Sequence, residues 1–134
     1  MDKVYVVGVG MTPFGKMLDV DIKAMTRQAV EQALSDAGIE KSALQAAFFG
    51  NATQGHMEGQ DMIRGQIALR GMGIGGIPVM NVENACASGA SALNLAITYV
   101  RAGQAEVALA VGAEKMYSQD RELMLSAFNG GWDV

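Results

Sequence analysis

The only cysteine in the chain and its neighbours are the residues best suited to catalysis. Cys86 stands in the run Asn84-Ala85-Cys86-Ala87-Ser88-Gly89, where an expected strand gives way to an expected helix. Unpaired backbone N–H groups and the helix dipole at such a point favour a thiolate over a thiol. The thiolate is the nucleophilic form of cysteine. Acyl-thioester chemistry with Cys86 as the nucleophile is therefore the first hypothesis.

The residues that flank Cys86 are small, namely Ala85, Ala87, Gly89 and Ala90. A bulky acyl group could approach the sulfur between them, and backbone N–H groups at the turn could hold a thioester oxyanion. A lone intracellular cysteine is more often a small buried hydrophobe, and small residues also allow a helix to pack closely on a sheet. Composition alone leaves both interpretations open.

Two other features are weaker candidates for chemistry. His56 is the only histidine, and its place in the Gly-containing loop 51–60 favours a solvated loop residue over a general base. Gly8, Gly10 and Gly15 follow the first expected strand, but their spacing does not match a dinucleotide-binding turn. We interpret these glycines as a plain turn.

Polar residues and methionines near these positions have two interpretations each. Glu83 and Asn84 adjoin Cys86, and either they anchor the turn by hydrogen bonds, which we favour, or they take part directly in the chemistry. Gln60 and Arg64 either contact a partner or lie on a solvated helix face. Four methionines either line an acyl pocket or fill the core: Met57, Met62, Met72 and Met80.

The elements that must position Cys86 alternate between strand and helix. Strands are expected at 4–9, 46–50, 79–83 and 106–111, and helices at about 22–37, 61–70 and 86–103. Asp21 is expected to cap the first helix and Gly38 to end it. From Tyr117 onward the pattern loosens. The alternation predicts an α/β fold of βαβαβ type with right-handed crossovers and a mainly parallel sheet.

The helix after Cys86 carries no charged residue before Arg101. Its apolar face is expected to contain Leu93, Ala96, Ile97 and Val100, and its outer stripe Ser88, Ser91, Asn94 and Thr98. A surface helix normally has charges on its outer face. We therefore expect a cover on both faces. One is the sheet, and the other comes from sequence beyond this chain or from another subunit.

Composition narrows the class of protein. The 134 residues are 50% hydrophobic and 18% charged with a net charge of −4, which predicts a globular domain. Without a basic cluster, nucleic acid and anionic membrane are poor partners. A single cysteine fits a reducing compartment, and neither a signal peptide nor a membrane span is recognisable. We expect a soluble cytoplasmic protein with neither a metal nor a resident cofactor.

The run Asn84–Gly89, followed by Ser91-Ala92-Leu93, resembles the nucleophile motif of the thiolase superfamily. It is most similar to that of the sterol-carrier-protein-X-type thiolases and the bacterial acetyl-CoA acetyltransferases. Further segments agree with that family in the same order: Val6–Gly15, Gly59-Gln60 with Arg64, and Gly112–Met116.

The resemblance implies that Cys86 attacks an acyl-CoA thioester and becomes acylated. The acyl group then passes to coenzyme A, or to the carbanion of a second acyl-CoA in a Claisen condensation. Coenzyme A is thus part of the substrate and not a cofactor. The family fold implies two similar halves, each a βαβαβαββ unit, with the helix after Cys86 buried between layers. It also implies a homodimer or a tetramer.

This sequence departs from the family in what it lacks. The resemblance places an activating histidine, a second cysteine and an Asn/His oxyanion site in the C-terminal half, and none of these motifs occurs here. Residues 1–116 correspond to the N-terminal core and 117–134 to the start of the substrate-covering loop region. We therefore do not expect this chain alone to be a competent thiolase. The alternatives are half of a lipid-transfer-protein-like aldolase, half of a ketoacyl synthase, or a non-catalytic half that binds a partner through its uncovered helix.

Overall fold

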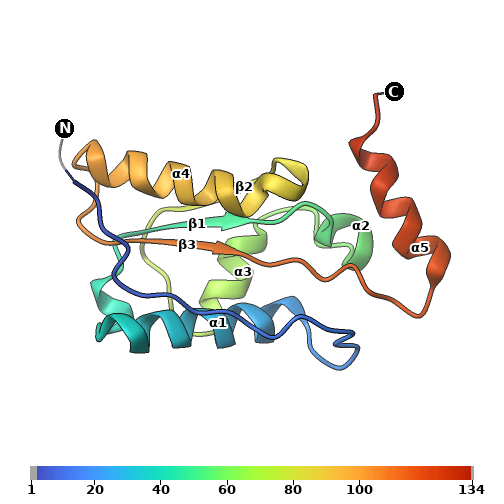
Figure 1. Ribbon diagram of the computed structural model, residues 1–134, viewed down its shortest axis with the longest axis horizontal. Helices are drawn as coiled ribbons and strands as arrows, with labels where there is room; N and C mark the ends of the chain where they lie inside the picture. The colour runs from blue at the N-terminus through green and yellow to red at the C-terminus, as the bar shows by residue number, and fades with distance from the viewer. Residues whose placement is uncertain (1–2, 134) are drawn as a thin grey trace.

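The computed structural model describes residues 3–133 and places a three-stranded parallel sheet between layers of helices (Figure 1). The strands are β1 (Ala46–Gly50), β2 (Val79–Val82) and β3 (Ala108–Gly112), in the order β2-β1-β3. Both neighbours pair with β1 in parallel. The predicted α/β class and the parallel sheet are therefore confirmed.

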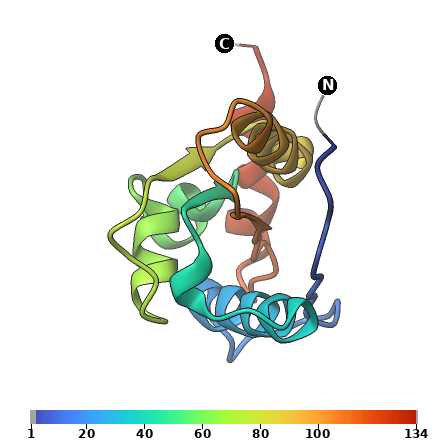
Figure 2. The same ribbon diagram turned by 90° about the vertical axis from the view of Figure 1, so that its left-hand side faces the viewer.

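The helices lie on both faces of the sheet and beyond the carboxyl ends of its strands (Figure 1). They are α1 (Ile22–Ala37), α2 (Gln54–Glu58), α3 (Arg64–Arg70), α4 (Ser88–Arg101) and α5 (Arg121–Ser126). Short 3₁₀ turns cover Lys41–Ala43, Ala85–Ala87 and Ala127–Gly131. Figures 1 and 2 show α4 on one face of the sheet, with α1 and α3 on the other. None of the helices in the described part has the length and apolarity to cross a bilayer.

The central strand β1 supplies both cores, because successive residues of a strand face opposite sides of the sheet. All five of its residues are buried. Phe49 lies in the core under α1 and α3, whereas Phe48 lies in the core under α4 and makes an edge-on contact with Tyr99. The strand is thus the rigid base on which the other elements are arranged.

Helix α1 begins and ends where the sequence predicts. The carboxylate of Asp21 accepts a hydrogen bond from the N–H of Ala24 at 2.7 Å. Gly38 adopts a left-handed conformation with φ 65°, and its N–H returns to the carbonyls of Leu34 and Ser35. Both caps satisfy backbone groups that a helix end leaves unpaired.

The predicted first strand, residues 4–9, is wrong: no strand of the described chain pairs with it. The N-terminal segment instead runs across the open side of the molecule beyond β3 and then beside α1 (Figures 1 and 2). Side chains of α1 hold its backbone, because the N–H of Val9 donates to Asp36 and that of Met11 to Gln32. A Cβ atom on Gly8 would lie 2.2 Å from the carbonyl oxygen of Ala33, so the segment lies directly against α1.

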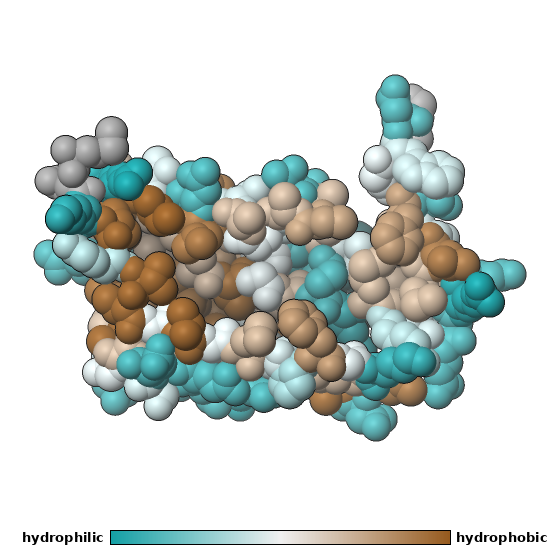
Figure 3. Space-filling view, in the orientation of Figure 1, coloured by the Kyte–Doolittle hydropathy of each residue, from teal (hydrophilic) through white to brown (hydrophobic). Residues whose placement is uncertain are grey.

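The valines of this N-terminal segment are therefore not buried. Tyr5, Val6, Val7 and Val9 are exposed by between 63% and 71%. In Figure 3 hydrophobic side chains gather on the side of the molecule where this segment lies. The β-branched composition of this segment is typical of a buried strand. Within the described residues, however, side chains of α1 bind its backbone, and no strand pairs with it.

Other elements differ from the prediction in smaller ways. Helix α2 lies inside the expected loop 51–60, and α3 begins at Arg64 instead of at about Asp61. Beyond Tyr117, where no element was expected, α5 and a 3₁₀ turn form. The boundary at 116/117 between core and loop region stays a prediction. The outermost residues of the two predicted regions, Met1, Asp2 and Val134, lie outside the described residues.

The buried face of α4 matches the expected one only in part, because Ala96 is buried as expected but Ser88 lies inside and not on the outer stripe. Ser88, Ala92 and Ala96 are buried against the sheet, whereas Leu93 is 45% exposed. Small residues face inward because the helix approaches the strands closely. In the described part of the chain nothing covers the outer, uncharged face of α4, so a second cover stays a prediction.

Candidate active site

Cys86 lies on the 3₁₀ turn Ala85–Ala87, which joins the end of β2 to the first residue of α4. Its side chain is exposed and forms no disulfide. Ala85, directly before it, has φ 45°, a left-handed conformation that is uncommon for a residue with a side chain. Strained backbone of this kind is found where a fold holds a side chain in a required position. The predicted position of Cys86 between strand and helix is confirmed.

Side chains on both sides of the turn fix its backbone. The N–H of Ala85 donates to the carboxylate of Glu83 at 2.6 Å. The hydroxyl of Ser88 accepts from the N–H of Asn84 at 2.9 Å and donates to the carbonyl of Ala85 at 2.7 Å. Asn84 also donates through its side chain to Ser91. The predicted anchoring by Glu83 and Asn84 is therefore what the structure shows.

Glycines let the turn rest directly on the sheet. A Cβ atom on Gly112, the last residue of β3, would lie 3.2 Å from the Cα of Gly89 in the first turn of α4. A Cβ atom on Gly50, the last residue of β1, would lie closer still, at 2.6 Å from the carbonyl oxygen of Ser88. The N-terminus of α4 is therefore in contact with the carboxyl ends of two parallel strands, the edge at which open α/β sheets bind ligands.

A polar network occupies the same edge of the sheet. The carboxylate of Glu114 accepts hydrogen bonds from the backbone N–H groups of Ala52 and Thr53, at 2.9 and 3.0 Å. It also accepts from the Thr53 hydroxyl and from the side-chain amide of Asn51. Sequence reasoning had grouped Glu114 only with a family motif. Its partners lie more than sixty positions earlier, which no local pattern could indicate.

Arg64 turns towards Asn51, whereas Gln60 bonds within its own loop. Arg64 donates to the backbone carbonyls of Gln60 and Asn51 and to the side-chain oxygen of Asn51. Gln60 donates to the carbonyl of Met62. These residues thus hold the loop between β1 and α3, and neither is simply part of a solvated helix face.

His56 and the methionines have contacts of their own. His56 is on helix α2, not in a loop, and its ring bonds the hydroxyl of Ser126 at 2.8 Å. Met72 lies in the core under α1, and Met80 packs on the opposite face of the sheet, so the four methionines do not share one pocket.

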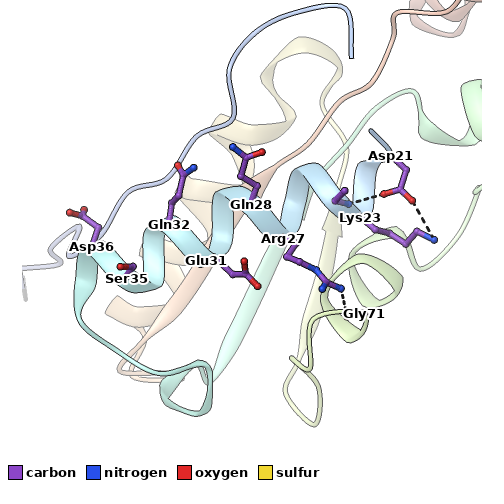
Figure 4. Close-up of a pocket in the computed structure, with 10 residues that line it drawn as sticks. Asp21, Lys23, Arg27, Gln28, Glu31, Gln32, Ser35, Asp36 and Gly71 are labelled. Atoms are coloured by element: carbon purple, nitrogen blue, oxygen red, sulfur yellow. Dashed lines mark hydrogen bonds and ion pairs between the residues drawn. The ribbon is translucent and has the colours of Figure 1, made fainter. Parts of the chain in front are cut away.

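The hollow drawn in Figure 4 does not belong to this site. It is a polar depression along α1, lined by residues such as Arg27, Glu31 and Asp36 together with Gly71. An exposed ion pair joins Lys23 and Asp21 at its rim. Because α1 and α4 lie on opposite faces of the sheet, this hollow is unrelated to Cys86. No group of three or more metal-ligating side chains occurs among residues 3–133.

The chain belongs to the thiolase family. Residues 4–130 match the family described as "Thiolase, N-terminal domain". Within it, the chain is 40% identical over 114 residues to a benzoylsuccinyl-CoA thiolase subunit of Thauera aromatica, covering 84% of this chain and 28% of that protein.

Two further relatives have similar sequence identity to this chain. Identity is 39% to sterol carrier protein 2 of Gallus gallus, with 85% of this chain and 20% of that protein covered. The sequence identity to an acetyl-CoA acetyltransferase of Methanothermobacter thermautotrophicus is 40%, with 87% of this chain and 30% of that protein covered. The chain therefore spans less than a third of the length of these relatives.

The fold has matching solved structures. The 3-oxoacyl-[acyl-carrier-protein] synthase III of Aquifex aeolicus superposes with a TM-score of 0.65 over 78% of this chain and 35% of that one. The two sequences are 19% identical, so this comparison concerns the fold alone. The predicted thiolase-like fold class is confirmed.

Proposed function

We propose that this chain is the N-terminal part of a thiolase-type acyltransferase in which Cys86 accepts the acyl group of a coenzyme A thioester. The observation that carries the proposal is the exposed thiol on a turn whose backbone is strained at Ala85 and anchored at Glu83 and Ser88. Membership of the thiolase family supports this chemistry.

The proposed step is nucleophilic acyl transfer. The Cys86 thiolate attacks the thioester carbonyl carbon, and the carbonyl oxygen becomes an oxyanion in a tetrahedral intermediate. Collapse of the intermediate breaks the carbon–sulfur bond and releases coenzyme A as a thiolate, which takes up a proton. In condensation, the acyl group leaves Cys86 for the carbanion of a second acyl-CoA.

In thiolysis of a 3-ketoacyl-CoA, the Cys86 thiolate instead attacks the 3-keto carbonyl carbon. The bond between carbons 2 and 3 then breaks, and acetyl-CoA leaves as a carbanion that takes up a proton. The shortened acyl group passes from Cys86 to the thiol of a free coenzyme A.

This chain supplies the nucleophile and its support but not the whole set of catalytic groups. Its single histidine is bonded to Ser126, and its single cysteine is the nucleophile itself. We propose that a C-terminal half, in the same polypeptide or another, supplies the base and the acid and covers the outer face of α4. A homodimer or tetramer in the cytoplasm stays part of the proposal.

Intact-mass spectrometry before and after incubation with acetyl-CoA or acetoacetyl-CoA tests the acylation step. We expect a single added acetyl group that is absent in Cys86→Ser. An acetyl group retained in Cys86→Ser would contradict the assignment, because another residue would then be the acceptor. When the chain is completed by the C-terminal half, we expect thiolysis of a 3-ketoacyl-CoA that Cys86→Ala abolishes.

A second candidate function has support in the comparisons. Relatives include sterol carrier protein 2 and the "non-specific lipid-transfer protein-like 2" of Caenorhabditis elegans, which is 43% identical over 117 residues. A lipid-transfer-protein-like aldolase would cleave a carbon–carbon bond without an acyl-Cys86 intermediate. Activity of the completed enzyme that survives Cys86→Ala would favour this second function.

A further inference from the structure

We propose that Glu114 is a positioning residue for Cys86, acting through the backbone at the end of β1. Its role rests on the proposed function of Cys86 as the nucleophile. Glu114 follows β3 by two residues, and its carboxylate reaches the loop that follows β1.

The carboxylate of Glu114 binds this loop through four donors. They are the N–H groups of Ala52 and Thr53, the hydroxyl of Thr53 and the side-chain N–H of Asn51. Hydrogen bonds to an ionised acceptor are about twice as strong as those between neutral groups. Within residues 3–133 no cation forms an ion pair with Glu114, so these four donors are the protein groups that bind its carboxylate. The carboxylate therefore holds the loop, and does not merely lie beside it.

Asn51 extends the contact to both sides. It is 3% exposed, and its side chain donates to the carbonyl of Ala113 at 2.7 Å. Its side-chain oxygen accepts from the N–H of Gln54 and from Arg64. Asn51 is thus fixed between the end of β3 and the start of α2, with Glu114 closing the arrangement.

The backbone that Glu114 holds touches the Cys86 turn at both of its ends. The N–H of Asn51 donates to the carbonyl of Val82, where the chain leaves β2 towards Cys86. Gly50 lies under Ser88, where α4 begins, and its own carbonyl accepts from Ala113 at 3.0 Å. A displacement of residues 50–52 must therefore move the base on which Cys86 rests.

Alkylation of Cys86 by iodoacetamide tests this role without any acyl-CoA. Rates are measured by intact mass between about pH 6 and pH 9, the range in which a cysteine thiol ionises. The variants are Glu114→Gln and, as a matched control, Glu106→Gln, which removes an exposed carboxylate ahead of β3. Urea unfolding of each variant shows that the rates refer to folded protein.

We expect Glu114→Gln to slow alkylation by about threefold or more at neutral pH, because a displaced turn would no longer hold Cys86 at the position between strand and helix that favours the thiolate. Glu106→Gln keeps the wild-type rate. Thr53→Val removes one donor but keeps the charge of Glu114, and it should slow alkylation in the same direction. If Glu114→Gln fails to fold, Thr53→Val carries the test.

Two results would overturn the proposal. If the Glu114→Gln variant is less stable but keeps the wild-type alkylation rate and pH profile, Glu114 stabilises the fold and does not position Cys86. Faster alkylation in Glu114→Gln, with Thr53→Val unchanged, would show a through-space charge effect in place of positioning. The proposed acyl transfer fails separately, since wild-type chain that alkylates normally but takes no acetyl group in the completed enzyme would contradict that function alone.

Discussion

A Cβ atom on Gly50 would lie 2.6 Å from the carbonyl oxygen of Ser88. The end of β1 and the first turn of α4 thus meet backbone to backbone, with no room for a side chain between them. Since the hydroxyl of Ser88 bonds Asn84 and Ala85, the two residues before Cys86, this contact sets where the thiol stands relative to the sheet.

Gly50→Ala should therefore force α4 away from the sheet. We expect a loss of about 1–3 kcal/mol of unfolding free energy, the usual cost of overpacking a close contact. Urea denaturation of the variant beside Gly15→Ala measures it, since an added Cβ at Gly15 meets nothing within 4 Å. Equal stability of the two variants would mean that the close contact does not exist in solution.

Phe49 should be the most costly aromatic side chain to remove from the core. It is 1% exposed in the centre of the sheet, and Phe49→Ala should cost about 3–5 kcal/mol through lost burial and the cavity left behind. Phe14, which is 93% exposed, provides the control. Phe14→Ala should leave the thermal midpoint almost unchanged, and a comparable loss in both variants would contradict the described core.

The cap of α1 should be measurable by itself. Asp21→Ala removes the acceptor of the Ala24 N–H and should lower the unfolding free energy by about 1 kcal/mol. Asp19→Ala, two residues earlier and also exposed, should have little effect. Chemical denaturation distinguishes the two, and a larger loss in Asp19→Ala would show that the helix begins elsewhere.

The turn before Cys86 offers a pair of opposite glycine substitutions. Ala85 has φ 45°, whereas Ala87 has φ −96°. In Ala85→Gly the relief of about 1 kcal/mol of left-handed strain offsets the entropy that glycine loses on folding. Ala87→Gly has no such relief, and we expect it to lower the free energy of unfolding by about 0.5–1 kcal/mol. If urea unfolding shows the same loss in both, Ala85 does not adopt the left-handed conformation in solution.

Local signals predicted the elements whose ends are marked by residues of definite chemistry. Asp21 and Gly38 define α1, and the buried run Ala46–Gly50 defines β1, because capping and burial act over a few neighbouring positions. Cys86 was placed correctly for the same reason, since strand and helix meet at a turn of small residues.

Long-range contacts could not be predicted in this way. The hydrogen bond between Glu114 and Thr53 joins positions 61 residues apart, and neither a periodic pattern nor a helix cap in the sequence indicates it. The inward face of α4 was partly misjudged, because hydrophobicity favours Leu93, whereas the closeness of Gly50 and Gly112 admits only small side chains. Helix α2 was missed because five residues between turns give too short a pattern to recognise.

The N-terminal segment carries its valines on the outside of the molecule, and no strand of the described chain pairs with it. Uncharged β-branched runs of this kind are stretches from which sheets grow between molecules. The isolated polypeptide should therefore associate through residues 4–9 as its concentration rises, even while its core remains folded. How much of it stays dissolved is then set by residues 4–9, and not by the stability of the sheet that supports Cys86.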